Sequence, residues 1–428
     1  MFSAFFSKEV FTALKRPMIY IFMFIVGLLV FGAVVSDNII IGGTVGDVKK
    51  NAPTVVASFV SILNIFGLLF ATAFFNNAAL RDHKYGFNEI MFSTPLSKAG
   101  YFFGRFCGAW LLSTLVMLGI YMGFLIGSAI GPAMNWIGPE RIGDTPWRAF
   151  LNTYLLFVVP NMFLAGTIIF ALATKFKSTI ISFVGTLFII IGYIVSLNLS
   201  SDIENQSMAA LVDVFGVSAY GLDIQYFTPL ERNTITPSFT GHILKNRILW
   251  SIVGVVILLI SYFTFSFSVK AKKAKKNGKK KEVLRSSGVL NKPVFATEDL
   301  QGAVWPNFVS FFKINFLSIA KSSTFIILLL FSIILLISNL WGGFEYFGLK
   351  SYPVTYKMLD EINGISTLFV IIVLVFFSGE LIWRDRDNHI NEVIDGTPHH
   401  SIVSLVAKTL SLVILASVMH LFLSLIHI

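Results

Sequence analysis

The sequence predicts an all-α protein that crosses a membrane several times and contains a duplicated unit. Hydrophobic residues make up 55% of its 428 residues and charged residues only 13%, and 44 residues are Phe, whereas soluble domains average about 25% charged residues. Apolar runs of about 20 residues, the length that spans a bilayer, recur along the chain. A charged segment that follows one of these runs returns 303 positions later. Such recurrence is typical of a duplicated membrane unit.

Nine apolar runs are predicted to be membrane spans. Six lie in the first part of the chain, at residues 17–36, 54–75, 101–131, 150–174, 178–199 and 248–269. Three more lie at 324–341, 364–383 and from Ile402 onward. We therefore expect a six-span unit over residues 1–269, a linker over 270–303, and the first three spans of a second unit over 304–428. No small-residue cleavage site follows the first run, so we expect that span to be retained.

Basic residues predict the orientation, because short loops rich in Lys and Arg stay in the cytoplasm. The N-terminal stretch, the loops near Arg81 and Lys175, and the lysine run that begins at Lys270 all fall on one side. This distribution predicts a cytoplasmic N-terminus. Six spans return the chain to the same side, so the second unit repeats the first in parallel.

The lysine run contributes much of the net charge of +10. We interpret it as a solvated linker that lies against anionic lipid headgroups, and expect no nucleic-acid partner. Cys107 is the only cysteine, and no HExxH motif occurs. We therefore expect neither an intrachain disulfide nor a metal site.

The duplicated segment keeps both residue types and spacing. Its first copy contains Arg81, Asp82, Gly86, Glu89 and Pro95, and its second contains Arg384, Asp385, Glu392 and Pro398. His389 stands in the second copy where the first has Gly. Near the start of each unit, Phe311-Phe312 and Lys321 follow Phe5-Phe6 and Lys15 at an offset of 306.

Each copy is predicted to form a short amphipathic helix. Phe87, Ile90 and Met91 have the i, i+3, i+4 spacing of one helical face, with Asn88, Glu89 and Ser93 turned away. Ile390, Val393 and Ile394 hold the same places in the second copy. Such a helix either lies on the membrane surface or presents its polar face to a cytosolic partner. An interfacial anchor without a partner is the alternative.

The duplicated segment resembles the cytoplasmic coupling segment of type 2 ABC exporter permeases, in which Arg-Glu-x-x-x-Gly-Thr-x-Glu precedes an apolar pair and a Pro. In the first copy Asp82 replaces the usual Glu, and Phe87 replaces the usual Thr. The resemblance implies six-span ABC-2 type permease units coupled to cytosolic ABC ATPase subunits. The chain itself then needs no cofactor, since ATP and magnesium belong to the partner ATPase.

A narrower resemblance is to bacterial proteins in which two such permease units precede an M1-type zinc aminopeptidase-like domain. The similar stretches are Asp213–Gly216, Glu231–Thr234, Asn246–Trp250 and Gly379–Asp387. The last six residues, Leu423–Ile428, resemble a translated sequencing adapter. The chain is accordingly expected to be an N-terminal fragment.

The resemblance implies a membrane subunit of an exporter in the bacterial cytoplasmic (inner) membrane, itself not an enzyme. Arg81 and Asp82 would position the coupling segment by local ion pairing, Glu89 would contact the ATPase, and Pro95 would end the helix. Glu392 and Pro398 would act likewise in the second copy. Two alternatives stay open, namely a membrane anchor for a downstream peptidase and a structural membrane protein without an ATPase.

Polar residues inside spans are weaker candidates for substrate contacts. Asn64, Asn152 and Asn161 can mark a transport pathway, although interhelical hydrogen bonds explain such residues equally well. Glycines spaced four apart, at Gly104 and Gly108 and again from Gly119 to Gly127, predict close helix packing. The 200–246 loop is expected to be a packed, partly helical cap, with a surface that could meet a periplasmic partner.

Overall fold

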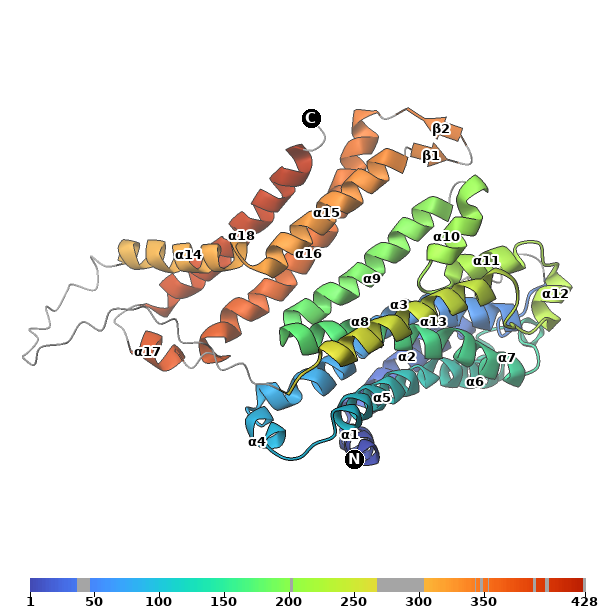
Figure 1. Cartoon of the computed structure of the whole chain (residues 1–428). Helices are drawn as coiled ribbons and strands as arrows, with labels where there is room; N and C mark the ends of the chain where they lie inside the picture. The colour runs from blue at the N-terminus through green and yellow to red at the C-terminus, as the bar shows by residue number, and fades with distance from the viewer. Residues whose placement is uncertain are drawn as a thin grey trace, which may run out of the picture. The chain divides into compact units, whose positions relative to one another are not determined.

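The computed structural model is helical almost throughout (Figure 1). It describes residues 1–36, 47–200, 203–267, 304–342, 344–346, 349–352, 354–387, 390–396 and 400–425. The chain divides into two compact units, one formed by Met1–Ser268 with Glu345–Lys350 and the other by Val269–Phe344 with Ser351–Ile428. The predicted linker at 270–303 lies outside the described residues.

Unit 1 begins with a short helix α1 (Phe2–Leu14), which precedes the first long apolar helix. The others are α2 (Met18–Val35), α3 (Pro53–Lys84), α4 (Asn88–Phe92), α5 (Lys98–Val116), α6 (Leu118–Ala133), α7 (Trp147–Thr153), α8 (Val159–Phe176), α9 (Thr179–Ser200), α10 (Gln206–Val212), α11 (Val217–Ile224), α12 (Pro229–Thr234) and α13 (Gly241–Thr264). A π-helical turn, Tyr154–Val158, joins α7 to α8. Pro160 explains this turn, since it cannot donate the helical hydrogen bond and crowds the preceding carbonyls.

Unit 2 consists of α14 (Val304–Ala320), α15 (Ser323–Gly342), α16 (Thr355–Asp387), α17 (Asn391–Asp395) and α18 (Ser401–Leu425). A two-stranded ribbon, β1 (Phe344–Tyr346) and β2 (Leu349–Ser351), joins α15 to α16. The pattern of packing in unit 2 matches that at the start of unit 1. Helix α14 packs on α18 as α1 packs on α5, and α16 packs on α18 as α3 packs on α5.

Seven stretches of the described residues are helical, long and apolar enough to cross a membrane. They correspond to seven of the nine predicted spans, so the chain is an all-α, multi-pass membrane protein. The predicted span 178–199 corresponds to α9, whose apolar part is the shorter Ile181–Leu197. The predicted span 324–341 corresponds to α15, which is bent by 56° relative to α14.

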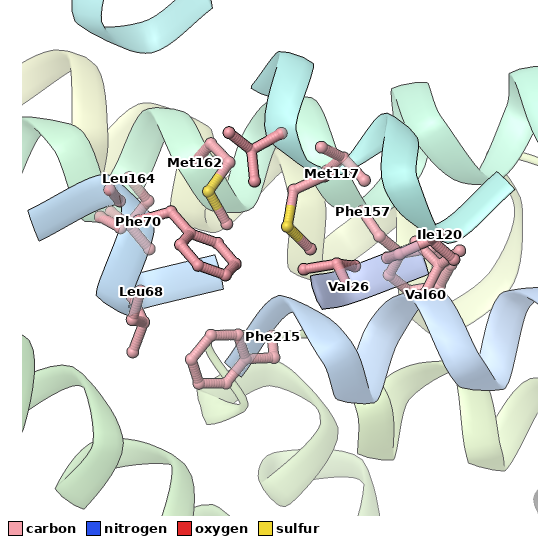
Figure 2. Close-up of a cluster of buried hydrophobic side chains, with 14 of the residues drawn as sticks. Val26, Val60, Leu68, Phe70, Met117, Ile120, Phe157, Met162, Leu164 and Phe215 are labelled. Carbon is pink, nitrogen blue, oxygen red and sulfur yellow. The ribbon is translucent and has the colours of Figure 1, made fainter. Parts of the chain in front are cut away.

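The core of unit 1 is made by aliphatic, aromatic and methionine side chains from several helices (Figure 2). Val26, Phe70, Met117 and Met162 come from α2, α3, the α5–α6 break and α8, and Phe215 comes from the segment after α10. By contrast, the 18-residue window of α2 is only 28% buried. Its apolar outer face is what a lipid-exposed helix requires.

Glycines on α5 and α6 let neighbouring helices approach closely, as predicted. A Cβ atom added at Gly104 would lie 2.8 Å from the Phe5 Cβ of α1. One added at Gly119 would lie 2.2 Å from the Met23 carbonyl oxygen of α2. Both distances are shorter than real contacts permit, so these positions accept only glycine without a shift of the helices.

Candidate functional site

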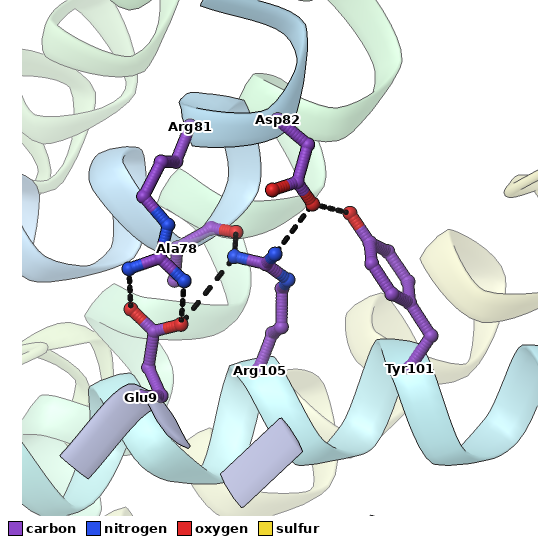
Figure 3. A network of polar contacts seen from close by, with 6 residues as sticks. All are labelled: Glu9, Ala78, Arg81, Asp82, Tyr101 and Arg105. Atoms are coloured by element: carbon purple, nitrogen blue, oxygen red, sulfur yellow. Dashed lines mark hydrogen bonds and ion pairs between the residues drawn. The ribbon is translucent and has the colours of Figure 1, made fainter. Parts of the chain in front are cut away.

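A buried charge cluster joins three helices of unit 1 near α4 (Figure 3). We call it the first cluster and define it as Glu9, Arg81, Asp82, Tyr101 and Arg105. Arg81 lies in the last turn of α3 and donates hydrogen bonds from Nη1 and Nη2 to the two carboxylate oxygens of Glu9, at 3.3 and 2.9 Å. Because Glu9 lies on α1, this bidentate pair attaches α1 to the end of α3.

Arg105 of α5 is the centre of the first cluster. Its Nη1 lies 3.4 Å from Glu9 Oε2 and 3.2 Å from the Ala78 carbonyl oxygen, and its Nη2 pairs with Asp82. The Tyr101 hydroxyl donates to Asp82 Oδ2 at 2.8 Å. Asp82 and Arg105 therefore link α3 to α5, and Arg105 also contacts the carboxylate that α1 contributes.

The charges of the first cluster balance, with two carboxylates and two guanidinium groups. Glu9, Asp82 and Arg105 are only 3%, 6% and 2% exposed. Removal of one member of such a set leaves an uncompensated buried charge, which typically costs about 3–5 kcal/mol. A network of this kind specifies one arrangement of its helices. The sequence analysis predicts local ion pairs for Arg81 and Asp82. In the structure, Arg81 instead pairs with Glu9 of α1, and Asp82 pairs with Arg105 of α5.

The α3 helix ends in a turn at Gly86. The backbone of Asp82, a member of the first cluster, takes part in this turn. Phe87 N donates to the Asp82 carbonyl at 2.9 Å and Gly86 N donates to the His83 carbonyl at 3.3 Å, the two bonds of a Schellman motif. Gly86 has φ +66°, which favours glycine. The Schellman motif thus ends α3 at Lys84, and α4 begins at Asn88, two residues after Gly86.

Helix α4 spans only five residues and presents both apolar and charged side chains outward. Phe87 and Ile90 are 50% and 63% exposed, and Glu89 is exposed as well. Asn88 is 9% exposed, so it is packed inward and not turned away with Glu89. Pro95 is exposed and lies between α4 and α5, three residues after the end of α4.

The second copy of the segment follows the same course at the end of α16. Ile390 N donates to the Asp385 carbonyl at 3.0 Å, the bond that corresponds to Phe87 and Asp82. Helix α17 then occupies the place of α4, with Glu392 exposed. His389 and Pro398 lie outside the described residues.

Unit 2 contains a second cluster, which we define as Asn315, Ser318, Arg384, Asp385 and Lys408. Arg384 Nη2 donates to Asn315 Oδ1 at 2.7 Å, and its Nη1 donates to Ser318 Oγ at 2.5 Å. Lys408 Nζ pairs with Asp385 Oδ2 at 2.7 Å. The second cluster therefore ties α14, α16 and α18 together as the first ties α1, α3 and α5.

Sequence reasoning identified the Arg-Asp pairs but missed their partners. Arg105 and Lys408 are separated by the same 303 positions as the two Arg-Asp pairs, and Glu9 and Asn315 by the 306 positions found near the start of each unit. Each unit has a basic residue within its third predicted span, and this feature of the sequence could have identified Arg105 and Lys408 as partners of the Arg-Asp pairs. Charged residues inside spans are rare unless they are paired.

The three candidate substrate residues donate hydrogen bonds to three different backbone carbonyls. Asn64 is fully buried and donates to the Val60 carbonyl of its own helix at 2.6 Å. Asn152 donates to the Pro237 carbonyl at 2.9 Å. Asn161 donates to the Phe215 carbonyl at 3.2 Å and accepts from Arg247 Nη1 at 2.5 Å. The side-chain amides of Asn152 and Asn161 therefore attach their own helices to the segment that follows α9.

That segment, at the opposite end of unit 1 from α4 (Figure 1), is packed and partly helical, as predicted. Val214 and Phe215 are buried, whereas Leu211 is 37% exposed. Asp213 is fully buried and accepts from the backbone N–H groups of Phe215 and Ser218 at 2.9 and 2.6 Å. Burial raises the pKa of the Asp213 carboxyl, an effect that these two N–H groups and Arg247 oppose.

Comparison of the chain with family models, with curated proteins and with solved structures gives no match. Among the described residues, no group of three or more His, Cys, Asp or Glu side chains is placed to hold a metal ion. Function must therefore be inferred from the two clusters and the short helices that follow them.

Proposed function

We propose that this chain is the membrane-spanning permease of an ABC exporter and moves an unidentified substrate with ATP hydrolysed by a separate subunit. The observation that carries the proposal is the duplicated junction at the end of α3 and of α16. In each copy a paired Arg-Asp end of a long apolar helix is followed by a short helix with an exposed glutamate. A membrane anchor alone would not need a short helix with an exposed glutamate in both copies.

In the proposed mechanism, cytosolic ATPase subunits dock on α4 and α17 through Glu89 and Glu392. ATP and magnesium bind to the ATPase. Movement of α4 passes to α3 through the glycine turn at Gly86, and Asp82 and Arg105 transmit it to α5 because their ion pair is buried. Arg81 passes the same movement to α1 through Glu9.

The proposal includes the arrangement inferred from the sequence. Six spans form the first unit, three spans begin a parallel second unit, and the N-terminus faces the cytoplasm of a bacterial inner membrane. The 200–246 segment then lies outside, where it offers a surface to a periplasmic partner. Support for this orientation comes from the basic residues near α4, including Lys84 and Lys98.

Charge reversal tests the docking proposal. The tagged chain is purified from its native membranes, and the amount and activity of any co-purifying ATPase are compared among wild type, Glu89→Lys, Glu392→Lys and the double variant. We expect each reversal to weaken ATPase retention, by roughly 2–5 kcal/mol if the contact is buried and less at a rim. Glu140→Lys reverses an exposed acid near the opposite end and serves as the matched control.

Unchanged ATPase retention in the double variant would contradict docking through these helices. Retention of no ATPase by the wild-type chain would instead favour a structural membrane protein. A zinc-dependent aminopeptidase activity of a longer product of the same gene would favour the anchor alternative.

A further inference from the structure

Helices α2 and α6 pack side by side and leave an apolar groove along their contact. Gly27 and Gly123 lie where the two helices touch, since a Cβ atom added at Gly123 would be 2.4 Å from the Gly27 carbonyl oxygen. Larger apolar side chains line the groove on either side, namely Phe24, Leu28 and Phe31 from α2 and Met122, Ile126 and Ile130 from α6. Of the described residues that line it, only Tyr20 has a polar side-chain group.

This groove faces the membrane hydrocarbon. Helix α2 is a candidate membrane span, and α6 is the second half of another, Lys98–Ala133. Phe24, Leu28 and Met122 are exposed, so the walls of the groove meet whatever surrounds the helices. Apolar walls without neighbouring atoms lose dispersion contacts, and in a bilayer the hydrocarbon chains of lipids supply those contacts.

The dimensions of the groove fit one lipid chain. Tyr20 and Phe31 are 11 positions apart, which is about 16 Å along a helix axis. That length is about half of the ~30 Å hydrocarbon thickness and so matches one leaflet. The volume is about 520 Å³, which over this length gives a mean cross-section of about 30 Å², against about 80 Å² for a helix about 10 Å wide. An extended hydrocarbon chain fits such a groove, whereas another helix does not.

The Tyr20 end of the groove lies next to basic residues. Lys15 and Arg16 come just before α2, and both are exposed. The only acidic residue among residues 1–36 is Glu9, which is buried and paired with Arg81. The exposed charged side chains of this stretch are therefore all basic. Basic residues beside a span attract anionic headgroups, and a Tyr ring suits the boundary between headgroups and hydrocarbon.

We propose that α2 and α6 bind an anionic phospholipid, with one acyl chain in the groove and the phosphate beside Lys15 and Arg16. The groove provides affinity for the chain, and the two basic residues select a negatively charged headgroup. This inference does not depend on the proposed transport function, because it uses only the membrane placement of the helices and the residues around the groove.

A lipid titration tests the selection of the headgroup. The full chain is purified in mild detergent, and native mass spectrometry measures the binding constant of the first dioleoylphosphatidylglycerol or dioleoylphosphatidylcholine molecule. We expect wild type to bind the anionic lipid more tightly. Lys15→Gln with Arg16→Gln should weaken its binding about thirtyfold, which corresponds to about 2 kcal/mol, and leave the binding of the zwitterionic lipid unchanged. Lys175→Gln with Lys177→Gln removes the same charge from another exposed pair and is the matched control.

A second comparison tests the place of the acyl chain. Leu28 and Leu29 are adjacent on α2 and are 54% and 53% exposed, but only Leu28 lines the groove. Leu28→Ala should weaken the binding of both lipids about fivefold, and Leu29→Ala should not. If Leu28→Ala does not accumulate in the membrane, Ile126→Ala and Ile25→Ala replace this pair. Ile126 and Ile25 are both 45% exposed, and only Ile126 lines the groove.

Three results would overturn the proposal. Equal binding constants of wild type for the two lipids would show that no headgroup is selected. Unchanged binding of dioleoylphosphatidylglycerol in Lys15→Gln with Arg16→Gln would remove these residues from the site. Equal effects of the groove variant and its matched control would show that the acyl chain does not lie between α2 and α6.

Discussion

Glu9 and Arg81 form a bidentate ion pair, at 2.9 and 3.3 Å, across 72 positions of the chain. The pair joins a helix at the N-terminus to the last turn of a membrane-crossing helix. It lies where Arg105 also reaches the same carboxylate, so three helices depend on one acidic side chain.

Neutralisation of Glu9 should destabilise the protein. Glu9→Gln keeps the shape of the side chain but leaves Arg81 and Arg105 with one carboxylate fewer, and we expect a loss of about 3–5 kcal/mol. Thermal unfolding of the purified protein in detergent measures the effect. Glu89→Gln, the same change at an exposed acid in the first turn of α4, should alter stability by less than about 0.5 kcal/mol. Equal effects of the two changes would contradict the role of the cluster.

Gly119→Ala should be more harmful than an alanine at another glycine of the same helix pair. The added Cβ would lie 2.2 Å from the Met23 carbonyl oxygen, a backbone atom that cannot rotate away. Separation of α2 from α6 should cost about 1–3 kcal/mol. Gly32→Ala meets no atom within 4 Å and should be neutral or stabilising by up to about 1 kcal/mol. Comparable melting temperatures for the two variants would show that α2 and α6 are not packed at these glycines.

Asp213 should give the protein a pH-dependent stability. Because burial raises its folded-state pKa above the ordinary value of 3.8, the folded state binds the proton more tightly than the unfolded state. Stability therefore falls as the pH rises from 3.8 through the raised pKa. Arg247 and Tyr193 are the ionisable groups that interact with Asp213 electrostatically.

Asp213→Asn removes this titration. We expect the melting temperature of wild type, relative to the variant, to decrease as the pH rises across that window and to level off above it. Thermal unfolding in detergent at several pH values from 4 to about 7 measures the difference. A difference that does not change with pH would show that Asp213 keeps its ordinary pKa.

Cysteine labelling in intact cells should place α4 and α12 on opposite sides of the membrane. Tyr85 is 75% exposed beside α4, and Tyr226 is 88% exposed just before α12. With Cys107 replaced by Ser, an impermeant thiol reagent should label Tyr226→Cys and not Tyr85→Cys, because basic loops stay in the cytoplasm. Labelling of Tyr85→Cys from outside would reverse the proposed orientation.

The sequence by itself determined the membrane class, the approximate helices and the duplicated Arg-Asp segment. These features are local: apolar runs of bilayer length form helices wherever they pack, and a spacing of 303 positions is visible without any fold. The glycines of α5 and α6 also predicted close packing, although not which helices they would meet. The sequence could not show that α3 continues as one helix through Arg81 to Lys84.

Only the tertiary structure decided which charges pair. Glu9, Arg81 and Arg105 lie on three different helices, and nothing in their spacing indicates that they meet. Their pairing depends on α1 crossing α5 at Gly104 and Gly108, where a side chain would hold the helices apart. Buried charges must find partners wherever the packing brings them, because an unpaired charge away from water costs more than most single contacts supply. Packing therefore determines the cluster, and the cluster in turn fixes the arrangement of its helices.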